Sequence, residues 1–116
     1  MKLRLTVNGA PLAATLDDNA ASRDLLKLLP LELTLQDYAL AEKIAYLPRK
    51  LDTASAPAGF APSAGDIAYY GPWGNLALFY RDQPFDSGLV RLGRIESGVD
   101  ALKGVGKLKL TLEAVK

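Results

Sequence analysis

The sequence predicts a small, mainly β protein that closes into a barrel of about seven or eight strands with one or two short helices. Three segments alternate strictly between apolar and polar residues, which is typical of strands with one buried face. Only two stretches carry signals for a helix. Short turns join most of the expected strands, and a closed barrel with helices at its ends buries such a set economically.

The first two strands are expected to form a hairpin. Residues 3–7 alternate leucine or valine with arginine and threonine. Asn8-Gly9 follows, and both residue types accept the positive φ angles of a type I′ turn. We therefore expect residues 3–7 to pair with residues 12–16. The same alternation predicts strands at residues 31–35 and 107–113.

One helix is expected between the hairpin and Pro30. Residues 17–19, Asp-Asp-Asn, supply side chains that cap a helix and negative charge at its start. Ala21, Leu25 and Leu29 then form one apolar stripe. Pro30 cannot donate the next helical hydrogen bond, so it ends the helix.

The second half of the chain predicts a long loop, three strands and a short helix. Residues 51–64 are rich in Ala, Pro, Ser and Gly, which indicates a surface loop. Ser97 and Asp100 have the spacing of a capping box, and Gly104 suits the end of a helix. Three apolar runs bounded by Gly and Pro are expected strands: residues 67–70, 76–80 and 89–95.

Length and composition limit the function. The 116 residues fit one domain, residues 1–116, with 49% hydrophobic and 23% charged residues. A net charge of +1 argues against a nucleic-acid partner, and the chain lacks the ~20-residue apolar stretch of a membrane span. Cys and His are absent, which removes disulfides and the usual zinc sites. We expect no metal and no cofactor. Residues 1–7 read as a strand and not as a secretory signal, which favours the cytoplasm.

Four segments carry a resemblance that spans nearly the whole chain: residues 64–80, 89–95, 22–30 and 42–49. They resemble the bacterial and archaeal cyclophilin-like domain family, small stand-alone barrels of largely unassigned function. The resemblance implies a cyclophilin-type barrel with a groove on its outer wall. It does not imply prolyl isomerase activity, because members of this family generally lack the isomerase residues.

The residues themselves argue against standard isomerase chemistry. In cyclophilins an arginine is followed by Phe five residues on and Gln three residues beyond that. Arg49 is the nearest candidate here, but Ala54 and Pro57 occupy those two positions. The pocket histidine is missing as well, since the chain has no His.

Aromatic residues are the first candidates for a groove. Trp73 lies in the loop Gly71-Pro72-Trp73-Gly74-Asn75, where it either stacks on a ligand or caps a tight turn. Tyr69 and Tyr70 are adjacent on a strand and must point to opposite faces, so one belongs to the core and the other is exposed or lines the groove. The groove candidates are Tyr46, Leu47, Pro48, Arg49, Tyr69, Tyr70, Trp73 and Arg91.

Charged residues within apolar strands have two interpretations. Arg91 either forms an internal ion pair, for which Glu42 is a candidate, or binds a carboxylate in the groove. The ion pair is favoured. The residues interpreted as structural are Glu42, Gly65, Asp66 and Gly93.

The function expected from these observations is non-catalytic binding of a small molecule or an extended peptide in an aromatic-lined groove. The alternative is a peptidyl-prolyl cis-trans isomerase that uses Arg49 or Arg91 in a non-standard catalytic set. A third possibility is an assembly module in which residues 107–113 form an exposed edge strand. A monomer or a weak homodimer is expected.

Overall fold

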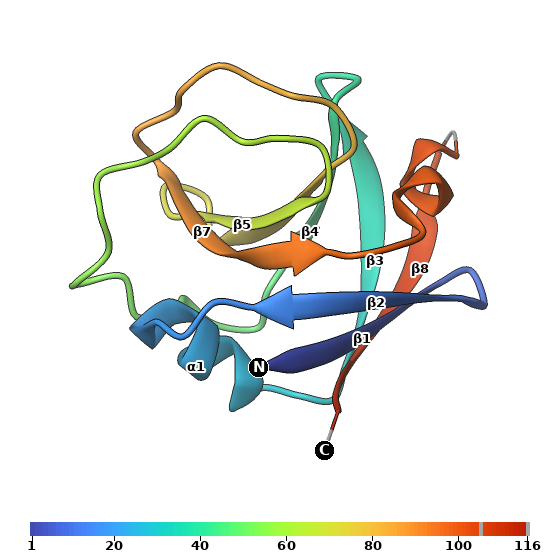
Figure 1. Cartoon of the computed structure of the whole chain (residues 1–116), viewed down its shortest axis with the longest axis horizontal. Coiled ribbons are helices and arrows are strands. Elements are labelled where there is room, and N and C mark those ends of the chain that lie inside the picture. The colour runs from blue at the N-terminus through green and yellow to red at the C-terminus, as the bar shows by residue number, and fades with distance from the viewer. Residues whose placement is uncertain (105, 116) are drawn as a thin grey trace.

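The protein is a closed antiparallel barrel of eight strands, as the sequence predicts (Figure 1). The computed structural model describes residues 1–104 and 106–115. Around the barrel the strands follow the order β1-β2-β7-β5-β6-β4-β3-β8, and β8 closes onto β1. The strands are β1 (Lys2–Val7), β2 (Ala10–Leu16), β3 (Leu31–Tyr38), β4 (Glu42–Tyr46), β5 (Asp66–Tyr70), β6 (Asn75–Phe79), β7 (Leu89–Ile95) and β8 (Leu108–Ala114).

The β1–β2 hairpin forms as expected. Asn8 and Gly9 have φ angles of 47° and 86°, which the type I′ turn requires. Leu5 lies opposite Leu12, and both are buried in the barrel. The alternation of apolar and polar residues thus places one face of each strand in the core and the other in solvent.

The last strand is not an edge strand. β8 pairs with β1 on one side and with β3 on the other, so its backbone groups are used within the barrel. The expectation of an exposed edge at residues 107–113 is wrong, because barrel closure supplies a partner for each side of every strand.

The main helix, α1 (Ala20–Leu26), is shorter than expected. Asn19 caps it by accepting a hydrogen bond from the Ser22 amide at 2.8 Å, whereas Asp17 forms an ion pair with Arg91. After Leu26 the chain continues in tighter i to i+3 turns towards Pro30, which disfavours helical geometry before it.

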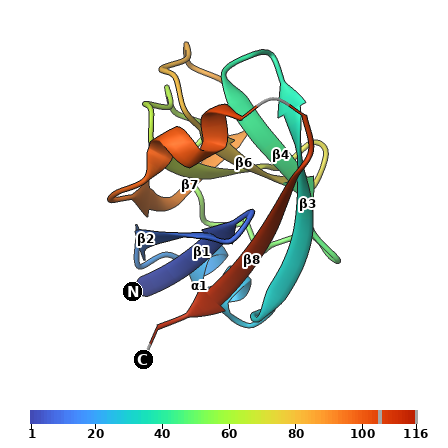
Figure 2. The same cartoon turned by 90° about the vertical axis from the view of Figure 1, so that its right-hand side faces the viewer.

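The second helix is a single short turn. It is the 3₁₀ helix η1 (Val99–Lys103), and α1 and η1 lie on opposite sides of the barrel (Figures 1 and 2). Leu25 of α1 and Leu102 of η1 are both buried in the barrel core. The expected Ser97–Asp100 capping box does not form, because Gly98 occupies the N-cap position in a left-handed conformation. Among the described residues, neither helix has the length and hydropathy needed to cross a bilayer.

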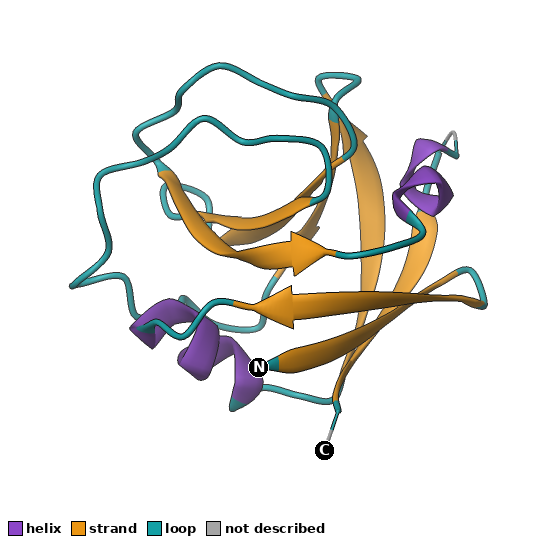
Figure 3. Ribbon diagram, in the orientation of Figure 1, coloured by secondary structure: helices purple, strands orange, loops and turns teal. Residues whose placement is uncertain are grey.

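Two long loops, residues 47–65 and 80–88, lie on the same side of the barrel (Figure 3). They are joined by hydrogen bonds from the Gln83 amide to the Pro62 carbonyl and from the Asp86 amide to the Phe60 carbonyl, at 2.9 and 3.2 Å. Under them lies a second apolar cluster, separate from the core, that contains Ile44, Ala68, Ala77, Phe79 and Leu89. Ile44, Phe79 and Leu89 of this cluster line the candidate site.

Candidate functional site

The site lies on the outer wall of the barrel, where four adjacent strands share one face. Register places Glu42 of β4 opposite Phe79 of β6, and Ile44 opposite Ala77. Tyr70 of β5 lies opposite Asn75 of β6 and also opposite Leu89 of β7. Because directly paired residues point to the same face, these side chains gather outside the barrel while their sequence neighbours fill the core.

Trp73, together with Tyr38 and Tyr70, forms an aromatic wall of the site. Its ring meets Tyr38 at a centroid distance of 5.4 Å and Tyr70 at 5.3 Å, with interplanar angles of 86° and 88°. Edge-to-face pairs of this kind are favourable and fix the orientation of the indole. The side chain nevertheless remains 48% exposed, so a ligand can reach it. The interpretation of Trp73 as a groove wall is therefore compatible with the structure.

The walls enclose a pocket of about 210 Å³. Residues 83–86 supply the side of the pocket opposite the strands, and Phe85 is exposed there. The hydrogen bonds between the two long loops hold this segment in place. The lining residues are Tyr38, Ala39, Glu42, Ile44, Tyr70, Trp73, Asn75, Phe79, Gln83, Pro84, Phe85, Asp86 and Leu89.

Two polar groups in the pocket are incompletely satisfied. No described residue forms a hydrogen bond or ion pair with the Glu42 carboxyl. Burial, together with the negative charge of Asp86, raises the pKa of Glu42 to about 7. The Asn75 side-chain amide donates to the Leu76 carbonyl at 3.0 Å, but its buried Oδ1 has no partner among the described residues. Buried polar atoms are nearly always paired, so Asn75 Oδ1, together with the half-buried Glu42 carboxyl, makes this pocket the candidate site.

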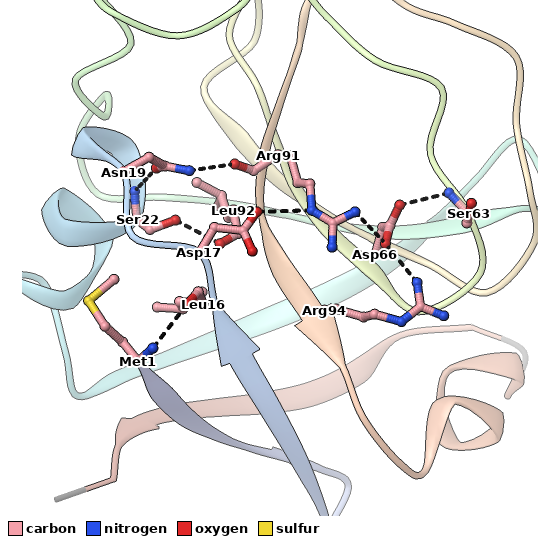
Figure 4. A network of polar contacts seen from close by, with 10 residues as sticks. All are labelled: Met1, Leu16, Asp17, Asn19, Ser22, Ser63, Asp66, Arg91, Leu92 and Arg94. Carbon is pink, nitrogen blue, oxygen red and sulfur yellow. Dashed lines mark hydrogen bonds and ion pairs between the residues drawn. The ribbon is translucent and has the colours of Figure 1, made fainter.

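Arg91 belongs to a different part of the same wall (Figure 4). Its guanidinium contacts Asp17 at 2.9 Å and Asp66 at 3.3 Å, and Arg94 also contacts Asp66, at 3.1 Å. The expected Glu42–Arg91 pair is wrong. Glu42 is on β4 and Arg91 is on β7, and the two intervening strands separate them by about 14 Å across the sheet.

Arg91 also lines a second hollow, of about 390 Å³, next to α1 and the loop of residues 52–60. Its positive charge is already balanced there by the two carboxylates. Asp66 is further fixed by the Ser63 amide, which donates to it at 2.8 Å. This arrangement ties β7 to β5 and to the segment before α1, so its contacts account for a structural role.

Arg49 is likewise engaged in a structural contact. Both of its terminal nitrogens donate to Asp24 at 2.8 Å, and the Asp52 amide donates to the same carboxylate at 2.8 Å. The hydrogen bonds from the Arg49 side chain and from the Asp52 amide hold the pKa of Asp24 well below its usual range. The ion pair joins α1 to the start of the first long loop, away from the residues that line the aromatic pocket.

The structure separates the remaining groove candidates. Tyr70 lines the pocket, whereas Tyr69 is 1% exposed in the core and accepts a hydrogen bond from the Leu51 amide at 3.2 Å. Tyr46 lies opposite Asn75 on the outer face but does not line the pocket. Leu47 packs against the core, and Pro48 is exposed.

Two glycines interpreted as structural have clear geometric reasons. A Cβ at Gly93 would collide with the backbone of Thr15 and Leu16, so β7 approaches β2 this closely only with glycine. Gly65 has a φ angle of 95°, which favours glycine at the turn before β5.

Sequence reasoning did not identify most of the pocket. Of the lining residues, the sequence predicts Tyr70 and Trp73 as groove candidates and Glu42 as a structural residue. A usable signal was Phe85, an apolar aromatic residue within the polar segment Arg-Asp-Gln-Pro-Phe-Asp-Ser. The other missed lining residues include Tyr38, Asn75 and Phe79. Within residues 1–104 and 106–115 no group of three or more acidic side chains is placed to hold a metal ion.

Comparisons with known proteins agree with this architecture. The model of the cyclophilin-like family matches residues 5–114. The fold is similar to the solution structure of a hypothetical protein from Archaeoglobus fulgidus, with a TM-score of 0.75 and 22% identity, covering 99% of this chain and 95% of the other. No curated protein matches the chain. The family match covers almost the whole barrel, and the chain belongs to the cyclophilin-like family.

Proposed function

We propose that this chain is a non-catalytic binding module that holds a small organic group in the aromatic pocket beside Trp73. The group is a small molecule or one side chain of an extended peptide. The observation that carries the proposal is the combination of an accessible indole, fixed between two tyrosines, with a buried acceptor that has no protein partner. Ligand sites typically combine apolar walls with a few unsatisfied polar groups in this way.

The dimensions of the pocket support a small ligand. A volume of about 210 Å³ accommodates one ring or one apolar side chain. The hydrogen bonds that join the two long loops support a largely preformed site. A preformed site loses little conformational entropy on binding, which favours even a small ligand.

The isomerase alternative receives less support from the geometry. A cyclophilin-type reaction uses an arginine that donates a hydrogen bond near the prolyl nitrogen. The described residues that line the pocket include no arginine, and both candidates, Arg49 and Arg91, are held by carboxylates. We therefore expect peptides with an X-Pro bond to exchange between cis and trans at their uncatalysed rate.

The test is a titration of the labelled protein with a panel of small aromatic, aliphatic and X-Pro peptide fragments, followed by backbone amide NMR. The proposal expects at least one fragment class to shift the amides around Tyr38, Trp73 and the 83–89 segment in wild type and not in Trp73→Ala. Peptide exchange is read in the same samples. Accelerated exchange would favour the isomerase, and fragments that shift no amide near the pocket would contradict the binding module.

A further inference from the structure

We propose that the aromatic pocket selects a primary ammonium group carried on a small apolar body, with Glu42 as its counter-charge, Asn75 Oδ1 as a hydrogen-bond acceptor and the aromatic rings around its apolar part. This inference rests on the proposed function, since it names the ligand class for the same pocket. It follows from the charges, the acceptor and the rings of the lining residues.

The charges that line the pocket are all negative. Glu42 and Asp86 are the ionisable carboxyl groups, and the described lining residues include neither lysine nor arginine. Asp86 accepts a hydrogen bond from the Gly88 amide at 2.8 Å, whereas the Glu42 carboxyl is left without a partner among the described residues. A half-buried carboxylate is costly to desolvate unless a positive charge accompanies it, and a cationic ligand supplies that charge.

Asn75 independently requires a ligand that donates hydrogen bonds. The side chain is 1% exposed, and it shares the outer face of β6 with Phe79. Its Nδ2 donates to the Leu76 carbonyl, which fixes the amide so that Oδ1 is the free acceptor. An N–H of a ligand satisfies this atom, whereas a carboxylate or phosphate would be repelled by it and by Glu42.

The aromatic walls suit a cation on an apolar body. Five of the chain's nine aromatic residues line this one pocket: Tyr38, Tyr70, Trp73, Phe79 and Phe85. The face of an aromatic ring attracts a cation, most strongly for tryptophan, and the attraction increases when the cation is desolvated. The same rings provide apolar contact for the rest of the ligand.

The test compares benzylamine with benzyl alcohol, which has a similar shape and no charge at neutral pH. Trp73 is the only tryptophan of the chain, so its fluorescence reports on the pocket directly. At pH 8 we expect benzylamine to bind at least about tenfold more tightly than benzyl alcohol. Glu42→Gln is expected to remove about tenfold of the benzylamine affinity and leave benzyl alcohol unchanged.

Glu32→Gln is the matched control. It removes the same charge from an exposed position on β3, outside the lining of the aromatic pocket. We expect it to bind both probes as wild type does. Equal loss of benzylamine affinity in Glu32→Gln and Glu42→Gln would show that overall charge and not the pocket carboxyl is responsible, and would overturn the inference.

A pH series adds a second readout. The titratable groups that face Glu42 in the pocket are Asp86, Tyr38 and Tyr70. Burial and the nearby charge of Asp86 raise the pKa of Glu42 to about 7, so Glu42 ionises between pH 5.5 and 8. Benzylamine affinity is therefore expected to rise by up to about tenfold between pH 5.5 and 8 in wild type and to stay flat in Glu42→Gln.

The two levels of the proposal fail differently. Equal affinity for benzylamine and benzyl alcohol, each lost in Trp73→Ala, would overturn selection of an ammonium group and leave the binding pocket in place. Absence of any Trp73 response to both probes, with a folded protein by NMR, would overturn the ammonium inference. If the wider fragment panel also fails, the binding module fails with it.

Discussion

The outer wall of this barrel carries two groups of carboxylates that differ in how they are satisfied. Asp17 and Asp66 accept from Arg91, and Asp66 also accepts from Arg94 and the Ser63 amide. Glu42 and Asp86 lie among aromatic rings, without a cation among the described lining residues. The carboxylates of the first group have their cationic partners within the protein, and these contacts hold its elements together. In the second group Asp86 accepts from the Gly88 amide, whereas Glu42 has no partner among the described residues, and this difference is the basis of the proposed binding site.

The largest expected effect is a loss of folding stability when the first group of carboxylates is disrupted. Asp66→Ala removes the buried carboxylate and leaves Arg91, Arg94 and the Ser63 amide without their shared acceptor. We expect the free energy of unfolding to fall by about 2–4 kcal/mol, measured by urea denaturation. Asp100→Ala is the control, because it breaks only an exposed pair with Lys103 and should cost less than about 0.5 kcal/mol. Similar losses in the two variants would mean that the Asp66 network does not hold the wall together.

Trp73→Ala acts on the second group. The side chain is half exposed but packs edge-to-face on two tyrosines, so its loss should destabilise the fold by about 1–3 kcal/mol. Benzylamine affinity, measured by NMR because the fluorophore is gone, should fall by about 30-fold. Trp73→Phe is expected to recover part of this loss, since it restores a ring between Tyr38 and Tyr70. A variant that unfolds would instead assign Trp73 to the structural part of the wall.

Glu42→Gln is expected to stabilise the unliganded protein above pH 7. The folded state holds the Glu42 proton up to a pKa of about 7, whereas the unfolded chain releases it near 4.5. The folded state binds more protons between these values, so wild-type stability falls as pH rises from 4.5 to 7 and stays low above. The amide avoids this loss, which is worth about 1–3 kcal/mol at pH 8.

Thermal unfolding of wild type and Glu42→Gln at pH 4.5 and pH 8 checks this expectation. The variant should gain stability over wild type only at pH 8. A variant less stable than wild type at pH 8 would indicate that the ionised Glu42 has a protein partner.

The smallest expected effect on binding is that of Arg49→Ala. The Arg49–Asp24 pair is satisfied within the protein and lies outside the aromatic pocket. Benzylamine affinity should therefore stay within about twofold of wild type. Because Arg49 lowers the pKa of Asp24, wild-type stability from this pair is present above the unfolded pKa and is lost as pH falls through the acid range. The variant should lack that component of acid sensitivity in unfolding experiments, and a large loss of binding would return Arg49 to the site.

The barrel was predictable because alternation records which face of a strand is buried. Leu3, Leu5 and Val7 are buried as expected, and the Asn8-Gly9 turn fixes the register of the hairpin. Contacts between side chains on different strands of the wall were harder to predict from the sequence. Pairing Glu42 with Arg91 required the order of β4, β6, β5 and β7, which no local pattern specifies.

The site was predictable only in part, because it too depends on which strands lie side by side. Trp73 and Tyr70 stand out by residue type, and the adjacency of Tyr69 and Tyr70 shows that only one of them reaches the outer face. Asn75 is opposite Tyr46 and Tyr70, and its importance follows from an unpartnered atom that exists only in the folded structure. Sequence alone therefore indicates aromatic residues for a site, and the fold adds the polar groups from which the ligand class is proposed.

The most direct test of this contrast is a backbone amide NMR map of wild type titrated with benzylamine at pH 8. The expected shifts gather at Glu42, Trp73, Asn75 and residues 83–89, and leave the amides of Asp17, Asp66 and Arg91 unmoved. Shifts centred on the Arg91 network, or spread evenly over the barrel, would contradict the assignment of the aromatic pocket as the binding site.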